Sequence, residues 1–181
     1  MVTSPSARDT SAEAALAPHR SLSRRRLLDP WFRRCVLAVL AALVCAGLLD
    51  VFGQQPVTSH ARGAAAELSV QAPASLRGGL IFQARFTVAA HRALRKPALV
   101  LERGWFEGMS VNAILPDPNS GLSRNGVVRL TYPPMQAGDS LTVWIYFQVN
   151  PTTVGSRRET VELADGSARL ARIERAVRVW P

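Results

Sequence analysis

The chain has 181 residues and a formal net charge of +9, and its two cysteines, Cys35 and Cys45, both lie in one apolar stretch. This length fits one folded domain and a short additional segment. Because residues 53–181 contain no cysteine, a disulfide framework and a zinc–thiolate site are excluded there. That part of the chain must be stable through its hydrophobic core alone.

Residues 1–30 are rich in serine, alanine, proline and charge, and they contain no aromatic side chain. A segment of this composition cannot bury enough apolar surface to offset the entropy lost on ordering. We therefore predict a disordered basic tail over residues 1–30.

The apolar stretch covers residues 35–52, CVLAVLAALVCAGLLDVF. As a helix, a run of this length extends about 27 Å, close to the thickness of a hydrocarbon core of about 30 Å. The flanks also suit a membrane, because Trp31 and Phe52 lie where aromatic belts lie, and Arg33 and Arg34 can extend their guanidinium groups into the headgroups. We predict a transmembrane helix over residues 31–52, anchored by membrane lipid at these four side chains.

Basic residues predict the orientation of this helix. Seven arginines precede Cys35, whereas the first basic residue after Phe52 is Arg62. The positive-inside rule places the tail in the cytoplasm and the C-terminal part outside the cell, in the envelope. This location argues against nucleic acid as a partner. A cleaved signal peptide and the buried helix of a soluble core are the alternatives, although the basic leader is long for the former.

Residues 53–66, GQQPVTSHARGAAA, are small and polar and include Pro56 and Gly63. We predict a linker there. From Glu67 onward, apolar and polar residues alternate with a period of two, which is typical of half-buried strands. The expected strands are residues 67–72, 80–90, 98–102, 109–115, 127–132, 140–150, 157–164 and 167–180.

Three segments have features that lead to more specific predictions. The segment 140–150 is apolar on both faces, which indicates a strand that is not at a sheet edge. Residues 116–125 predict a turn-rich loop. Asp165–Gly166 predicts a tight hairpin turn before the last segment, for which the spacing of Leu170, Ile173 and Val177 leaves a helix as the alternative.

Together these patterns predict a mainly β protein: one N-terminal transmembrane helix followed by an antiparallel Ig-like β-sandwich of seven to eight strands over residues 67–181. The segments LSVQAPASLRGGLIFQARFTV (68–88) and MQAGDSLTVWIYFQV (135–149) resemble parts of bacterial Ig-like envelope modules. With its anchor, the chain is similar to single-pass membrane proteins of high-GC Gram-positive bacteria. The resemblance implies a binding or scaffold role, with no catalytic residues and no cofactor.

Motifs for catalysis are weak. Gly108–Asn112 lacks the second glycine of a nucleophile elbow. His60 and His91 lie far apart and have no partner at metal-ligand spacing, so we expect no metal site. Glu102 and Glu107 flank Gly104–Trp105, and loop-edge charges explain them better than a glycosidase carboxylate pair.

Aromatic residues supply the candidate partner-binding side chains: Trp105, Phe106, Trp144 and Tyr146. Trp105 and Phe106 follow a glycine, and they either anchor a partner or cap one end of the sandwich, with burial favoured. Trp144 and Tyr146 share one face of the segment 140–150.

Arginines recur every third residue at positions 169, 172, 175 and 178, and they form a basic stripe only if the last segment is a helix. The sequence thus predicts a non-enzymatic membrane protein that presents an Ig-like domain to a membrane or envelope protein. An envelope enzyme of another type, secreted or anchored, and a binder of anionic envelope polymer are the alternatives.

Overall fold

The computed structural model describes residues 23–48 and 55–181, with side chains from residue 30 onward. The chain divides into two compact units at the Phe52–Gly53 bond. The first unit contains helix α1 (Ser23–Leu48), and the second contains every strand of the described residues. Each unit is described by itself.

Helix α1 begins at Ser23, so residues 23–30 are helical, whereas the sequence predicted that they belong to the disordered tail. Leu and Ala dominate the helix, and both are strong helix formers. Its segment Pro30–Leu48 is long and apolar enough to cross a membrane, and none of it is buried. Residues 1–22 of the predicted tail, and Phe52 of the predicted anchor, lie outside the described residues.

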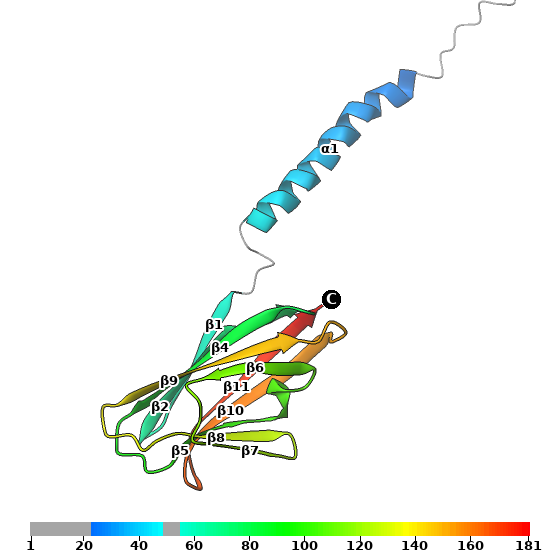
Figure 1. Ribbon diagram of the computed structural model, residues 1–181. Coiled ribbons are helices and arrows are strands. Elements are labelled where there is room, and N and C mark those ends of the chain that lie inside the picture. Colours follow the sequence, from blue (N-terminus) through cyan, green and yellow to red (C-terminus); the bar gives the residue numbers. More distant parts are fainter. Residues whose placement is uncertain (1–22, 49–54) are drawn as a thin grey trace, which may run out of the picture. The chain divides into compact units, whose positions relative to one another are not determined.

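The second unit is a sandwich of two sheets (Figure 1). The five-stranded sheet has the order β1-β2-β4-β9-β6, and the six-stranded sheet has the order β3-β11-β10-β5-β8-β7. The strands are β1 (Pro56–Arg62), β2 (Ala66–Pro73), β3 (Ser75–Arg77), β4 (Ile81–Ala90), β5 (Pro97–Leu101), β6 (Met109–Leu115), β7 (Ser120–Arg124), β8 (Val127–Thr131), β9 (Ser140–Val149), β10 (Gly155–Asp165) and β11 (Ala168–Trp180). A short 3-10 helix, η1 (Arg103–Trp105), follows β5.

The predicted mainly β fold, a sandwich of two sheets preceded by one N-terminal apolar helix, is confirmed. Each of the eight predicted segments forms a strand, and β9 pairs with both β4 and β6, as its two apolar faces indicated. Two details differ within the described residues. Strands β1, β3 and β7 bring the total to eleven, and β3 pairs in parallel with β11, whereas the other pairs are antiparallel.

Strand β1 corrects the predicted linker 53–66. It pairs with β2 along its whole length, from Pro56 opposite Pro73 to Arg62 opposite Glu67. Its residues are mostly polar and exposed because β1 is an edge strand that adds little to the core. Backbone pairing with β2 holds residues 56–62 in an extended conformation. A search for alternating apolar and polar side chains therefore did not identify β1 as a strand.

Strand β7 corrects the predicted loop 116–125. All five of its residues are exposed, so its sequence has no buried alternation. The signal lay instead in the turn, because Asn125 and Gly126 both have positive φ, at 53° and 77°, and they join β7 to β8. An Asn-Gly pair of this conformation is the strongest short-range hairpin signal.

The last hairpin confirms the strand interpretation of residues 168–180. Asp165 pairs with Ala168, so Gly166–Ser167 is the two-residue loop, one position later than predicted. Asp165 has another role: its carboxylate accepts hydrogen bonds from the backbone N–H groups of Arg95 and Lys96, at 3.2 and 2.6 Å.

The core lies between the two sheets. Alternate residues of the long strands point inward, and buried leucine, valine, isoleucine and phenylalanine side chains fill the space. At its centre, the ring of Trp105 lies 5.1 Å from that of Phe86 and 5.6 Å from that of Phe147, measured between centroids.

Candidate functional site

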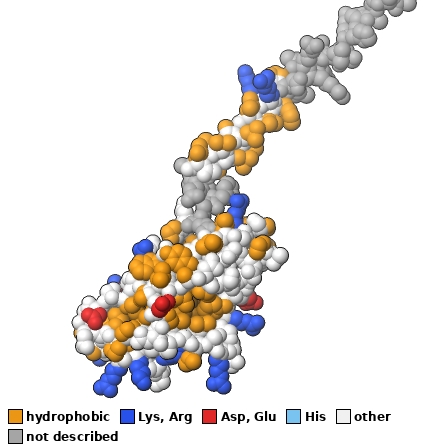
Figure 2. Space-filling view, viewed as in Figure 1, with side chains coloured by type: hydrophobic (Ala, Val, Ile, Leu, Met, Phe, Trp, Pro, Cys, Tyr) orange, Lys and Arg blue, Asp and Glu red, His pale blue; other side chains and the backbone are white. Residues whose placement is uncertain are grey.

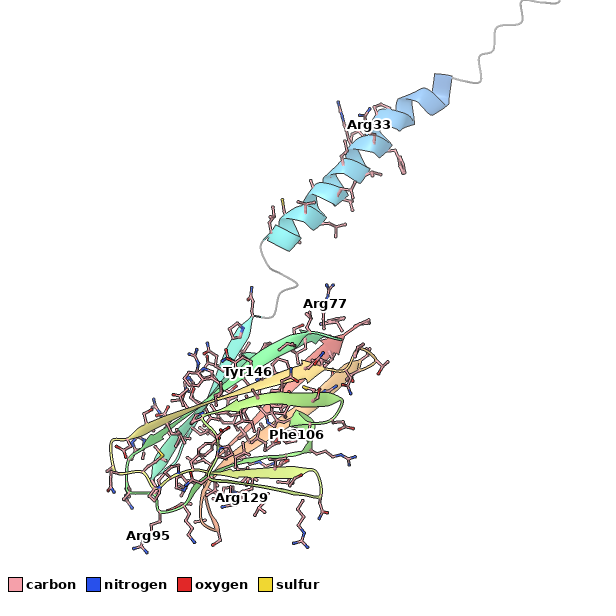
Figure 3. All side chains as sticks on the ribbon, viewed as in Figure 1. Arg33, Arg77, Arg95, Phe106, Arg129 and Tyr146 are labelled. Carbon is pink, nitrogen blue, oxygen red and sulfur yellow. The ribbon has the colours of Figure 1, made fainter. Side chains whose placement is uncertain are left out.

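The outer face of the five-stranded sheet carries two aromatic side chains of β9. Val143, Ile145 and Phe147 point inward and are buried, so the period of two directs Trp144 and Tyr146 outward, where each is half-buried. Figure 3 labels Tyr146 on this face. The predicted proximity of these two residues is therefore observed.

Strand β4 adds two polar partners beside these rings. Tyr146 lies opposite Gln83, whose Nε2 donates a hydrogen bond of 3.1 Å to the tyrosine hydroxyl. Trp144 lies opposite Arg85, whose guanidinium carbon lies 5.8 Å from the ring centroid, within range of a cation–π interaction. These contacts orient both rings across the sheet.

Strand β6 completes the face from the other side. Leu115 pairs with Trp144 and Ala113 pairs with Tyr146, because an extra residue near Asn112 shifts the register. A β-bulge of this kind reverses which side chains point outward. As a result Leu115, which is half exposed, extends the apolar surface next to Trp144. We call this set the aromatic strip: Gln83, Arg85, Ala113, Leu115, Trp144 and Tyr146.

A shallow depression of about 340 Å³ adjoins the aromatic strip. It shares Gln83 and Arg85 with the strip, so the two form one continuous surface. Its lining residues are Pro56, Gln71, Pro73, Ile81, Phe82, Gln83 and Arg85. Figure 2 shows apolar side chains gathered over the part of the domain in which Figure 3 labels Tyr146 and Phe106.

Trp105 is completely buried, which confirms the favoured alternative of burial and removes Trp105 from the candidate partner-binding residues. Gly104 allows this burial, because a Cβ at that position would lie 1.8 Å from the carbonyl oxygen of Arg158. The indole N–H of Trp105 donates a 3.1 Å hydrogen bond to the carbonyl oxygen of Thr160. Phe106 is half-buried with its ring 6.3 Å from that of Phe147, so it packs on the core rather than joining the aromatic strip.

A charged pair lies inside the six-stranded sheet. Glu159 and Arg175 face each other across β10 and β11, and both are buried. The closest guanidinium and carboxylate atoms are 3.7 Å apart, too far for a hydrogen bond. The guanidinium instead donates to the carbonyl oxygens of Ala72 and Pro73, at 2.7 and 2.6 Å, and lies over the ring of Trp105.

Burial controls the ionisation of this pair. Desolvation raises the pKa of Glu159 from 4.5 to about 7, although the charges of Arg175 and Arg157 act in the opposite direction. A raised pKa agrees with the geometry, because neither carboxylate oxygen has a hydrogen-bond partner among the described residues. Burial also lowers the pKa of Arg175, while Glu159 raises it. Both side chains of the pair are buried in the core of the sandwich.

On the outer face of the six-stranded sheet, charged side chains pair with one another. Glu162 accepts hydrogen bonds from Arg169 and Arg172, at 3.1 and 2.6 Å, and Arg172 also lies 3.0 Å from Glu102. Because β11 is a strand and Arg175 points inward, the arginines that recur every third residue form no basic stripe. The alternative of an anionic-polymer binder therefore loses the feature on which it rested.

The remaining candidate groups for chemistry are dispersed. His60 lies 3.7 Å from Glu67 on the β1–β2 edge, and Glu102 is engaged by Arg172. Within residues 23–48 and 55–181, no group of three or more His, Cys, Asp or Glu side chains is close enough to hold a metal ion. On helix α1, Trp31 is exposed together with Arg33 and Arg34.

Sequence reasoning missed the partners of both tryptophans. The alternation of residues 80–90 places Gln83 and Arg85 on one face, but it does not say which strand lies beside them. For the buried pair a signal existed: Glu159 has the same parity as Val161 and Leu163, which point into the core. A charged residue at core parity indicates a buried charge that needs a partner.

Comparisons with known proteins leave the function open. No protein-family model and no curated protein matches the chain. Among solved structures, the chain is similar to CaCohA2 from Clostridium acetobutylicum, with 15% identity and a TM-score of 0.44 over 65% of this chain and 92% of that one.

It is also similar to a non-cellulosomal cohesin from Archaeoglobus fulgidus, with 15% identity and a TM-score of 0.39 over 68% of this chain and 91% of that one. A third similar structure is the human F-spondin reeler domain, with 11% identity and a TM-score of 0.44 over 62% of this chain and 88% of that one. Likenesses of this size assign no partner, so the aromatic strip must be interpreted from its own chemistry. The expected relation to envelope proteins of high-GC Gram-positive bacteria stays a prediction.

Proposed function

We propose that this chain is a single-pass membrane protein whose Ig-like domain binds another membrane or envelope protein, outside the cell, through the aromatic strip. One observation carries the proposal: Trp144, Tyr146, Arg85 and the half-exposed Leu115 share one outer sheet face. Trp, Tyr and Arg are the residue types that dominate the binding energy of protein interfaces.

The anchoring part of the proposal rests on helix α1 and its flanks. Pro30–Leu48 has the length and composition of a membrane span, and Arg33 and Arg34 lie near its start. The excess of arginine before the span favours a cytoplasmic N-terminus and an extracytoplasmic domain. The two exposed cysteines, Cys35 and Cys45, lie in the same helix.

A binding role is favoured over catalysis by the position of the buried charged pair. Glu159 and Arg175 are enclosed in the core, where a substrate does not reach them. The aromatic strip and its adjoining depression offer aromatic rings, amides and one guanidinium, which suit recognition of a protein. Arg85 makes no ion pair among the described residues, so its charge is available to an acidic group of a partner.

Site-specific photo-crosslinking in the native membrane tests the binding surface. A photoreactive residue at Leu115 lies on the aromatic strip, and one at Leu122 lies on β7 as a matched exposed leucine. We expect a discrete protein adduct from position 115 and none from position 122. Trp144→Ala should remove the adduct without unfolding the domain. Equal adducts at both positions, or an adduct that persists in Trp144→Ala, contradict the proposed surface.

Anchoring and catalysis have separate tests. Alkaline carbonate should leave the full chain in the membrane fraction, and protease added to intact cells should remove the C-terminal domain. If the intact mass corresponds to a chain that begins at Met1, the protein retains the span. If it corresponds to a chain that begins near Gln54, a signal peptide has been cleaved and the product is a secreted binding protein. If the purified protein turns over a substrate in a screen of hydrolase substrates, the interpretation as an enzyme is favoured instead.

A further inference from the structure

One end of the β-sandwich is formed by segments far apart in the sequence. The start of β1 pairs with the end of β2, at Pro56 and Pro73. The N–H of Gly78 donates to the carbonyl oxygen of Trp180 at 3.0 Å, and that of Gly79 donates to Val149 at 2.9 Å. The starts of β1 and β4 and the ends of β9 and β11 therefore meet at this end.

This end gathers exposed apolar side chains. Val57, Leu80, Ile81, Val154 and Trp180 are each 44% to 58% exposed. The other large apolar side chains exposed among residues 55–181 are Val111, Leu115 and Leu122, on β6 and β7. Isolated exposed apolar residues are normal, but a cluster at one end of a domain marks an interaction surface.

Basic side chains border the same cluster. Arg77 and Arg178 are both exposed at this end, and the guanidinium carbon of Arg178 lies 5.3 Å from the ring centroid of Trp180. The indole N–H of Trp180 donates a 2.9 Å hydrogen bond to the hydroxyl of Ser75, which holds the ring in place. We call these seven residues the basic–apolar rim: Val57, Arg77, Leu80, Ile81, Val154, Arg178 and Trp180.

The opposite end of the sandwich shows that charge alone does not define the rim. Arg92, Arg95 and Lys96 are exposed there, whereas Leu94, between them, is buried. Figure 3 labels Arg77 and Arg95 at opposite ends of the domain. Both ends are thus basic, and only the rim combines basic with exposed apolar side chains.

Chain length ties the rim to the predicted span. Seven residues, 49–55, separate Leu48 from Pro56, at which β1 begins. Fully extended, this number of residues reaches at most about 25 Å. If α1 spans the membrane, the end of the domain that carries the rim is covalently held near the bilayer surface.

We propose that the basic–apolar rim contacts the lipid headgroup layer of the membrane that α1 spans. Trp180 suits the interface, because tryptophan is enriched there with its apolar ring buried and its N–H hydrated. Val57, Leu80, Ile81 and Val154 enter the boundary between headgroups and chains. Arg77 and Arg178 bind lipid phosphates, because an anionic membrane surface attracts basic side chains close to it. This inference rests on the proposed membrane anchoring and adds an orienting contact to it.

A second copy of this chain fits the rim less well. A two-fold contact through the rim would bring Arg77 and Arg178 of both copies together, and like charges that face each other across an interface weaken it. An anionic headgroup layer supplies the opposite charge, so the composition favours lipid.

Fluorescence quenching in vesicles tests the rim with the full chain. Cys35 and Cys45 are first replaced by alanine. A bimane label is then attached at Thr152→Cys, in the exposed loop between β9 and β10 beside the rim, or at Ala93→Cys, at the opposite end. The chain is reconstituted in phosphatidylcholine vesicles with or without phosphatidylglycerol, and quenching by a headgroup spin-labelled lipid is compared with quenching by aqueous iodide.

We expect several-fold stronger headgroup quenching at position 152 than at position 93, with iodide quenching in the reverse order. The double variant Arg77→Gln/Arg178→Gln should reduce headgroup quenching at position 152 in the anionic vesicles. Its matched control, Arg92→Gln/Arg95→Gln, removes the same charge from the opposite end and should leave that quenching unchanged. A loss of quenching in both double variants would contradict a specific role of the rim.

Vesicle flotation separates this inference from the anchoring on which it rests. A chain that does not float with the vesicles refutes the anchoring. A chain that floats but shows equal headgroup quenching at positions 152 and 93 refutes the rim and leaves the anchoring intact. Protection from iodide without headgroup quenching, increasing with the protein-to-lipid ratio, indicates self-association and also overturns the lipid contact.

Discussion

Each sheet of the sandwich has an arginine over a tryptophan ring, and the distance is 5.8 Å in both cases. In the five-stranded sheet, Arg85 and Trp144 lie on the outer face, in contact with solvent. In the six-stranded sheet, Arg175 covers Trp105 inside the core, with Glu159 opposite. The same chemical contact is therefore accessible at Arg85 and Trp144 and enclosed at Arg175 and Trp105.

The difference teaches which contact is available to a partner. The guanidinium of Arg175 donates hydrogen bonds to the carbonyl oxygens of Ala72 and Pro73. Replacement of this buried arginine would therefore leave both carbonyl oxygens and Glu159 unpaired. The exposed arginine lies over the face of Trp144 and opposite Gln71, and it makes no ion pair among the described residues. We therefore expect the Trp105 contact to stabilise the fold and the Trp144 contact to be accessible to the proposed partner.

The largest expected effect follows from Trp105→Ala. Removal of a fully buried tryptophan should lower the free energy of unfolding by about 3–5 kcal/mol, since it leaves a cavity beside Phe86 and Phe147. Thermal unfolding of the full chain in detergent, followed by near-ultraviolet circular dichroism, measures the loss. A melting temperature equal to that of the unmodified chain would show that the ring does not support the core.

An intermediate effect is expected from pH, through Glu159. Its pKa is about 7 in the folded chain and 4.5 as a free side chain, so the folded state binds the proton more tightly. The stabilisation from this proton is fully present below pH 4.5 and is lost as pH rises through about 7.

The melting temperature of the unmodified chain should accordingly decrease between pH 5 and pH 8 relative to that of Glu159→Gln, whose amide does not titrate. The contributions of the histidines and surface carboxylates cancel in the difference between the two melting temperatures, because both chains contain these residues. A difference that stays constant over this pH range, or that changes in the opposite direction, would show that Arg175 holds Glu159 ionised in the core.

A smaller effect is expected from Trp144→Ala. This side chain is half-buried, so we expect a loss of about 1 kcal/mol of unfolding free energy, close to the centre of the distribution for single substitutions. Unfolding and photo-crosslinking from position 115 are measured on the same variant. A loss as large as that in Trp105→Ala would place Trp144 among the structural residues and break the distinction between the two sheets.

Arg85→Ala should have the smallest effect on stability, about 0.5 kcal/mol, since an exposed cation–π contact contributes little. Its effect on the crosslinked adduct should nevertheless be clear, because the guanidinium is free to pair with an acidic partner. Arg169→Ala, on the outer face of the six-stranded sheet, is the matched control and should leave the adduct unchanged. Weaker crosslinking in both variants would indicate a general charge effect rather than a directed contact.

The sequence predicted eight strands because most of these segments alternate apolar and polar side chains, as a half-buried strand requires, and because the segment 140–150 is apolar on both faces. It failed at β1 and β7 for one shared reason, which is that an edge strand with exposed residues carries no such alternation. For the candidate site, alternation placed Trp144 and Tyr146 on one face. It did not place Leu115 there, because the register shift near Asn112 is a property of strand pairing.

The sequence alone determined the apolar segment, the charge asymmetry around it and the β class of the following domain, since these depend on local composition and on the period of the side chains. Tertiary structure decided which tryptophan is accessible. Trp105 and Trp144 both have apolar neighbours in the sequence, and the close packing of Gly104 against the backbone of Arg158 allows Trp105 to enter the core. Contacts between segments more than 50 residues apart set the burial of each ring, and local patterns do not encode such contacts.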